Sequence, residues 1–176
     1  MNETQSKQVA MHQDFFDRCR FAIDNGFYME AILMEYAAIE ARLEVMLGVV
    51  NLPCSKKLEA GLRSSINISH RIRCTKWMVQ NSPLFEATKL DKQFFDSINE
   101  WIKERNRYVH GLYKNEGLYE MRKEDACVLA KEGLEHCRLL YNETRRLRRE
   151  LKKNPQFLDN AITCHSKQCK LWKETL

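Results

Sequence analysis

The chain has 176 residues, of which 44% are hydrophobic, and its formal net charge is +5. This hydrophobic share is ample for a core and excludes a disordered chain, and without a Gly/Ser/Pro-rich linker the length favours one domain over residues 1–153 with a tail over 154–176. A polar N-terminus and the lack of a long apolar stretch exclude a signal peptide and a membrane helix, and seven scattered cysteines indicate reduced thiols in a cytoplasmic protein.

Helical periodicity over almost the whole chain predicts an all-α protein, an up-and-down bundle of four to five helices. The first helix is expected over residues 4–24, where Asn25-Gly26 ends it. The second is expected over residues 27–50 and is apolar nearly all round, so that it must be covered on several sides. Glu35 lies on an otherwise apolar sector of this helix. A buried carboxylate needs a cation, and Arg105 is the obvious candidate.

A shorter, basic helical region follows up to Gln80, and a central helix then covers residues 94–113. On a helical wheel the central helix has one broad apolar face with Arg105 in its middle. An arginine that faces a core keeps its charge, so it needs a carboxylate or an anionic ligand. Asn106 and His110 are one helical turn apart and share the flank beside Arg105. Gly111 offers a helix stop near the end of this range.

The string Arg105-Asn106-x-x-x-His110 resembles the R-x(4–6)-H signature of the HEPN superfamily, helical ribonucleases and nucleotide-binding proteins in which a polar residue usually follows the arginine. The spacing also occurs between Arg63 and His70, but these lie in a Gly- and Ser-containing stretch and are interpreted as surface residues. The likeness rests on six residues, with the helical layout extending it loosely over residues 15–153.

The chemistry of these residues suits RNA cleavage without a metal. Histidine titrates near neutral pH and can transfer a proton to or from the reacting oxygens. Arginine offers a planar, permanently charged fork to phosphate oxygens, and Asn106 can orient the phosphate or the His110 ring. The resemblance implies the same roles, a 2′,3′-cyclic phosphate product and no cofactor. Glu35 and Tyr113 are the supporting candidates.

The last long helix is expected over residues 123–153, and charge is unevenly distributed along the chain. Residues 1–48 hold four basic and eight acidic residues, whereas residues 49–89 and 138–153 each hold seven basic and two acidic residues. Such zones suit a polyanion, although a solvated helix face is the alternative. The candidate RNA-binding residues in these zones are Arg71, Arg73, Lys76, Arg145, Arg146, Arg148 and Arg149.

One histidine per chain and a need for both an acid and a base predict a homodimer whose central helices meet at a shared site. The resemblance implies a dimer as well, and a toxin or antiphage-defence role with an antitoxin or defence partner protein. In HEPN toxins controlled by a nucleotidyltransferase, the modified tyrosine lies two residues after the histidine. Here that position is Leu112, and Tyr113 follows it.

Two other hypotheses remain open: a non-catalytic module of the same fold that binds nucleic acid, a nucleotide or a protein, and a helical interaction protein in which Arg105 is structural. No metal site is expected. Cys164, His165 and Cys169 are ligand-type residues but lack a second ligand pair. No phosphate-binding Gly-rich loop occurs either.

Overall fold

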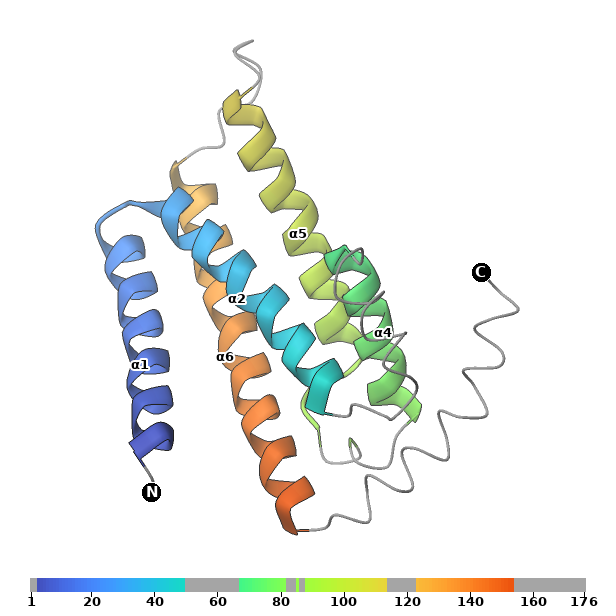
Figure 1. Ribbon diagram of the computed structural model, residues 1–176. Helices are drawn as coiled ribbons and strands as arrows, with labels where there is room; N and C mark the ends of the chain where they lie inside the picture. The colour runs from blue at the N-terminus through green and yellow to red at the C-terminus, as the bar shows by residue number, and fades with distance from the viewer. Residues whose placement is uncertain (1–2, 50–66, 82–84, 86–87, 114–122, 154–176) are drawn as a thin grey trace. The chain divides into compact units, whose positions relative to one another are not determined.

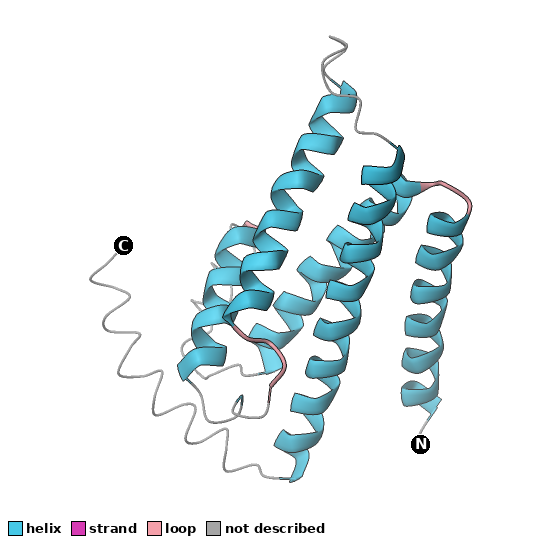
Figure 2. Ribbon diagram, turned by 180° about the vertical axis from the view of Figure 1, so that it is seen from behind, coloured by secondary structure: helices cyan, strands magenta, loops and turns pink. Residues whose placement is uncertain are grey.

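The computed structural model describes residues 3–49, 67–81, 85, 88–113 and 123–153. Within these ranges the chain forms five α-helices and no β-strand (Figures 1 and 2). This confirms the predicted all-α class for the described part of the chain. The helices are α1 (Glu3–Asp24), α2 (Tyr28–Val49), α4 (Ile68–Asn81), α5 (Lys92–Tyr113) and α6 (Lys123–Lys153).

The turn between α1 and α2 is built around Gly26, as the Asn25-Gly26 pair predicts. Gly26 has a φ of 78°, a left-handed conformation that glycine adopts without steric cost. The Gly26 amide donates to the Ile23 carbonyl at 3.2 Å and the Phe27 amide donates to the Ala22 carbonyl at 2.8 Å. These two bonds form a Schellman motif, which satisfies carbonyls that the end of α1 would otherwise leave open.

The start of α5 is set by Asp91, whose Oδ1 accepts a hydrogen bond from the Phe94 amide at 2.8 Å. This is an N-cap, which satisfies one of the amides that a helix start leaves free. The other end lies where the predicted range of 94–113 places it: α5 passes through Gly111, which offered an earlier stop, and ends at Tyr113. A single glycine inside a helix costs only about 1 kcal/mol, so it does not by itself end a helix.

The chain forms two compact units, and α2, α5 and α6 each contribute residues to both. The first unit comprises the described residues within Met1–Ile39 and Ile98–Arg138, and the second comprises those within Glu40–Ser97 and Leu139–Leu176. In the first unit the core lies where α1, α2, α5 and α6 bury apolar side chains, among them Cys19, Ile32, Ile98, Trp101 and Ala130.

The second unit has a core of its own, to which α4 contributes. Its fully buried side chains include Leu43, Met46, Ile72, Phe95 and Leu140. Burying one such side chain stabilises the fold by roughly 1.5–3 kcal/mol.

Polar contacts join the elements of the second unit at its edges. The Thr88 hydroxyl donates to Glu143 Oε2 of α6 at 2.8 Å, and its oxygen accepts a bond from the Leu90 amide at 3.1 Å. The segment before α5 is thereby attached to α6.

None of the described helices has an apolar stretch long enough to cross a membrane. The predicted tail over 154–176 lies outside the described residues.

Candidate functional site

The C-terminal half of α5 positions the three motif residues in the first unit. Ile98, Trp101 and Ile102 are buried and fix the apolar face of this half of the helix. Arg105 follows one turn later and is half-buried, as is Asn106. The predicted position of Arg105 beside a core is therefore observed.

The Arg105 guanidinium is held by an aromatic ring and by an amide. Its Cζ atom lies 4.2 Å from the centroid of the Tyr36 ring on α2, a cation–π contact. Its Nη1 donates to Asn106 Oδ1 at 2.9 Å. Its Nε is buried and has no hydrogen-bond partner. The guanidinium is thus oriented, but not all of its donors are satisfied.

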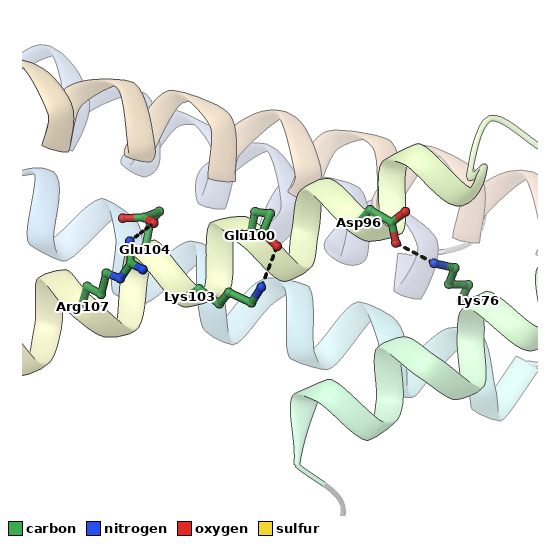
Figure 3. Close-up of polar contacts among 6 residues, drawn as sticks. All are labelled: Lys76, Asp96, Glu100, Lys103, Glu104 and Arg107. Atoms are coloured by element: carbon green, nitrogen blue, oxygen red, sulfur yellow. Dashed lines mark hydrogen bonds and ion pairs between the residues drawn. The ribbon is translucent and has the colours of Figure 1, made fainter.

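Carboxylates neutralise the neighbouring cations on this half of α5 but leave Arg105 unpaired. Lys103 Nζ lies 2.7 Å from Glu100 Oε1, and Arg107 pairs with Glu104 in the same way (Figure 3). Arg105 forms no ion pair within the described residues. A half-buried guanidinium without a carboxylate partner has the charge and the donors that an anion can pair with.

His110 is exposed and has no polar partner in the described part of the chain. It lies five residues after Arg105, about 140° around the helix and about 7.5 Å further along its axis. Asn106 lies between them, one turn before His110. The structure therefore brings Arg105 and Asn106 together, while His110 projects from the adjoining flank. Tyr113 is the last residue of α5, and its side chain lies outside the described residues.

Glu35 is fully buried on α2, and neither of its carboxyl oxygens has a hydrogen-bond partner. The predicted ion pair with Arg105 is not formed in this structure. Burial raises the pKa of the Glu35 carboxyl to about 9, so the group is protonated at neutral pH. Burial, and secondarily Glu35, raises the pKa of the Cys19 thiol to about 12. A neutral carboxyl explains how Glu35 remains buried without a cation.

Gly133 on α6 makes room for Glu35 and for Trp101. A Cβ atom added at Gly133 would lie 2.6 Å from Trp101 Cζ2 and would overlap Glu35 Oε2. Trp101 is fixed by a bond from its Nε1 to the Leu129 carbonyl at 2.8 Å. The His136 and Trp101 rings meet edge to face, with their centroids 6.3 Å apart. Burial lowers the pKa of His136 to about 4. This closely packed layer supports the helix that carries Arg105.

The chain matches no protein family, no curated protein and no solved structure.

The predicted RNA-binding residues separate into paired and unpaired cations. In the second unit, Arg71 lies 3.2 Å from Glu44 Oε2, Lys76 lies 2.6 Å from Asp96 Oδ1 (Figure 3), and Arg146 lies 2.9 Å from Glu143 Oε2. Only 12% of the Arg71 side chain is exposed, so this residue joins α4 to α2. Arg73 is exposed and has a further contact. Of the predicted RNA-binding residues, Arg145, Arg148 and Arg149 are exposed and have no partner within the described part of the chain.

No group of three or more His, Cys, Asp or Glu side chains that would hold a metal occurs among the described residues. Cys164, His165 and Cys169 lie outside them.

The sequence interpretation missed Tyr36, Gly133 and His136. Tyr36 follows Glu35 directly, and in sequence its ring does not stand out from the apolar residues around it. A lone glycine inside a strongly helical segment is a usable signal for Gly133, because such a position often marks a close approach of side chains. His136 carries no comparable signal, since an isolated histidine on a helix is as often exposed as buried.

Proposed function

We propose that this chain is a metal-independent endoribonuclease in which Arg105, Asn106 and His110 act at the scissile phosphate of RNA. The observation that carries the proposal is the uncompensated charge of Arg105. Its guanidinium is half-buried, stacked on Tyr36 and bonded to Asn106, and it has no carboxylate partner within the described residues. An RNA phosphate supplies the missing anion, and its oxygens match the guanidinium fork.

Each motif residue has a distinct role in this proposal. The ribose 2′-oxygen attacks the phosphorus, the bond to the 5′-oxygen breaks, and the products carry a 2′,3′-cyclic phosphate and a 5′-hydroxyl. His110, which is exposed, either removes the 2′-proton or protonates the leaving 5′-oxygen. Arg105 stabilises the negative charge that develops on the phosphorane oxygens. Asn106 holds Nη1 of Arg105 and so positions the guanidinium.

We propose that each chain folds as an up-and-down helical bundle. We also propose that the working unit is a homodimer in which the two copies of α5 lie together. Transesterification needs a base and an acid at once, whereas the motif supplies one histidine per chain. A two-fold axis would supply the second His110. The outward surface of α2 supports association, because Leu33 is 42% exposed and Ala37, one turn later, is also exposed. Light scattering at the assay concentration tests this arrangement, and a fully active monomer would contradict it.

The second candidate function is a binding module of the same fold that holds a phosphate without cleaving RNA. This alternative is favoured by one observation: within the described residues, nothing bonds to the His110 ring and fixes its orientation. If this chain cleaves RNA, the resemblance to HEPN proteins implies a toxin or defence role with a partner protein. A binding module that does not cleave carries no such implication.

Incubation with mixed RNA in excess EDTA separates these functions. A ribonuclease of the proposed type cleaves RNA, leaves DNA of the same sequence intact and produces fragments that end in a 2′,3′-cyclic phosphate. The DNA control is matched, because it differs from the RNA only in lacking the attacking 2′-hydroxyl and in having thymine, with its methyl group, in place of uracil. Binding of RNA without cleavage would favour the binding module, and cleavage of DNA at the same rate would exclude the 2′-hydroxyl mechanism.

A further inference from the structure

The second half of α6 has a set of basic side chains that internal ion pairs leave unused. Residues 138–153 contain seven basic residues and two acidic residues. Three of the seven cations are paired: Arg138 with Glu135, Arg146 with Glu143 and Lys153 with Glu150. Both acidic residues of the segment are consumed by these pairs.

The four remaining cations are Arg145, Arg148, Arg149 and Lys152, here called the α6 cationic ridge. All four are exposed, and none has a carboxylate partner within the described residues. At 100° per residue they fall within an arc of about 100°, and they cover about 10 Å of the helix axis. The ridge is therefore one continuous positive strip and not a ring of charge around the helix.

An aromatic ring and a further arginine adjoin the N-terminal end of the ridge. Tyr141 lies one turn before Arg145, inside the same arc, and is half-buried. The Cζ atom of Arg42, from α2, lies 5.3 Å from the centroid of the Tyr141 ring. Both residues belong to the second unit, as the ridge does. This contact places Arg42 beside the N-terminal end of the strip.

We infer that the α6 cationic ridge binds the phosphate backbone of single-stranded RNA. The ligand class takes its support from the proposed function and from the composition of the ridge. Three of its four residues are arginines, whose planar fork bonds phosphate oxygens in pairs, and a neighbouring aromatic ring is a common part of surfaces that bind single strands. Pairing with a phosphate backbone releases counterions and so gives binding that falls with salt.

A lipid surface is the other large anion that a basic helix can bind, and the distribution of apolar residues disfavours it. Helices that lie on membranes carry large apolar side chains beside their cations. The large hydrophobic side chains exposed within the described residues are Phe21, Phe27, Leu33 and Val128, and all four belong to the first unit. The ridge thus has charge without the apolar side chains that membrane binding requires.

The test is a salt titration of binding to a short 2′-O-methyl RNA, which lacks the free 2′-hydroxyl and cannot be cleaved by the proposed mechanism. The ridge variant of the full chain replaces Arg145, Arg148, Arg149 and Lys152 by Gln. A control variant replaces Arg18, Arg20, Lys103 and Arg107 by Gln; these exposed cations are each paired with a nearby carboxylate. The two variants lose the same charge.

We expect the ridge variant to reduce the slope of log affinity against log salt by about 2 to 3, because each lost phosphate contact removes about 0.7 for single strands. The control variant is expected to change the slope by less than 1. A third variant with lysine at the three arginine positions keeps the charge and is expected to keep most of the slope. This variant guards against loss of binding through misfolding.

Equal slopes for the ridge and control variants would overturn the inference. It would also be overturned if vesicles of anionic lipid, and not RNA, bound in a ridge-dependent way. The outcome is separate from that of the cleavage assay, because the probe cannot be cleaved. Intact binding with no cleavage of ordinary RNA would remove the proposed function and leave the ridge in place.

Discussion

The Arg105 guanidinium lies over the Tyr36 ring, with its Cζ atom 4.2 Å from the ring centroid. The two residues come from different helices, α5 and α2, and both belong to the first unit. The ring attracts the cation without neutralising it, so Arg105 remains able to bind an anion. The contact thus orients the charge on which the proposed function depends.

Replacing Tyr36 tests whether this orientation matters. We expect Tyr36→Leu to lower kcat/KM for RNA cleavage by about 2- to 30-fold, since a cation–π contact contributes roughly 0.5–2 kcal/mol. Tyr36→Phe keeps the ring and should stay close to the unmodified protein. Steady-state kinetics of both variants provide the comparison. Equal losses in both would assign the effect to the hydroxyl group instead of the ring.

Glu35→Gln should flatten part of the dependence of stability on pH. The folded pKa of Glu35, about 9, lies above its ordinary value of 4.5. Its contribution to the free energy of unfolding is therefore complete below pH 4.5 and is lost as pH rises towards 9. Between pH 4.5 and pH 7 this loss amounts to about 3 kcal/mol, at 1.36 kcal/mol per pH unit. The Gln variant should therefore be more stable than the unmodified protein at pH 7 and nearly as stable as it at pH 4.5.

Urea unfolding of the Glu35→Gln variant at several pH values measures this difference. If the variant is instead much less stable at pH 7, and Arg105→Ala is destabilised equally, the two residues form an ion pair in solution. That result would support the structural role of Arg105.

Titration of His136 should lower the free energy of unfolding at acid pH, whereas titration of Glu35 lowers it as pH rises. Burial lowers the pKa of His136 from 6.5 to about 4. Its contribution to stability is complete above pH 6.5 and is lost as pH falls through about 4, by about 3 kcal/mol in total. Urea unfolding should be measured in the Glu35→Gln background, because that substitution removes the opposing titration of Glu35. His136→Gln should abolish the remaining decline between pH 6.5 and 4, and a decline that persists would have another source.

Gly133→Ala is expected to destabilise the protein by about 1–3 kcal/mol, the usual cost of overpacking. Helix propensity alone would make the alanine variant more stable, by about 1 kcal/mol. A loss of stability would therefore come from the close contacts of the new Cβ atom with Trp101 and Glu35. Thermal unfolding of the variant gives the result. In a Glu35→Ala background the cost should shrink but not vanish, because Trp101 remains in place. A more stable Gly133→Ala protein would show that this layer is looser than described.

The helices could be predicted from sequence because their signals are local. The periodicity, the Asn25-Gly26 pair and the composition of residues 123–153 gave bounds within two residues of α1, α2 and α6. Gly111 does not end α5, since its cost as a helix breaker is smaller than the stability that packing gives to this helix.

The site could be predicted only in part, because its contacts join residues far apart in sequence. A helical wheel places Arg105 beside a core, but it does not show that Tyr36 covers the guanidinium or that Glu35 stays unpaired. The basic zones show the same limit. Arg71 and Arg148 look alike in sequence, and only the positions of Glu40 and Glu44 on α2 remove Arg71 from the set of free cations.

The central claim is that Arg105 and His110 cleave RNA, and the most direct measurement is the cleavage rate of His110→Ala in excess EDTA. His110 is exposed, so the variant should fold as the unmodified protein does. We expect its rate to fall by about 10²- to 10⁴-fold with RNA affinity changed only a few fold, because a proton transfer contributes to the rate and little to ground-state binding. Lys103→Ala, on the same helix and also exposed, is the control and should keep full activity. Cleavage by His110→Ala at the unmodified rate would contradict the account.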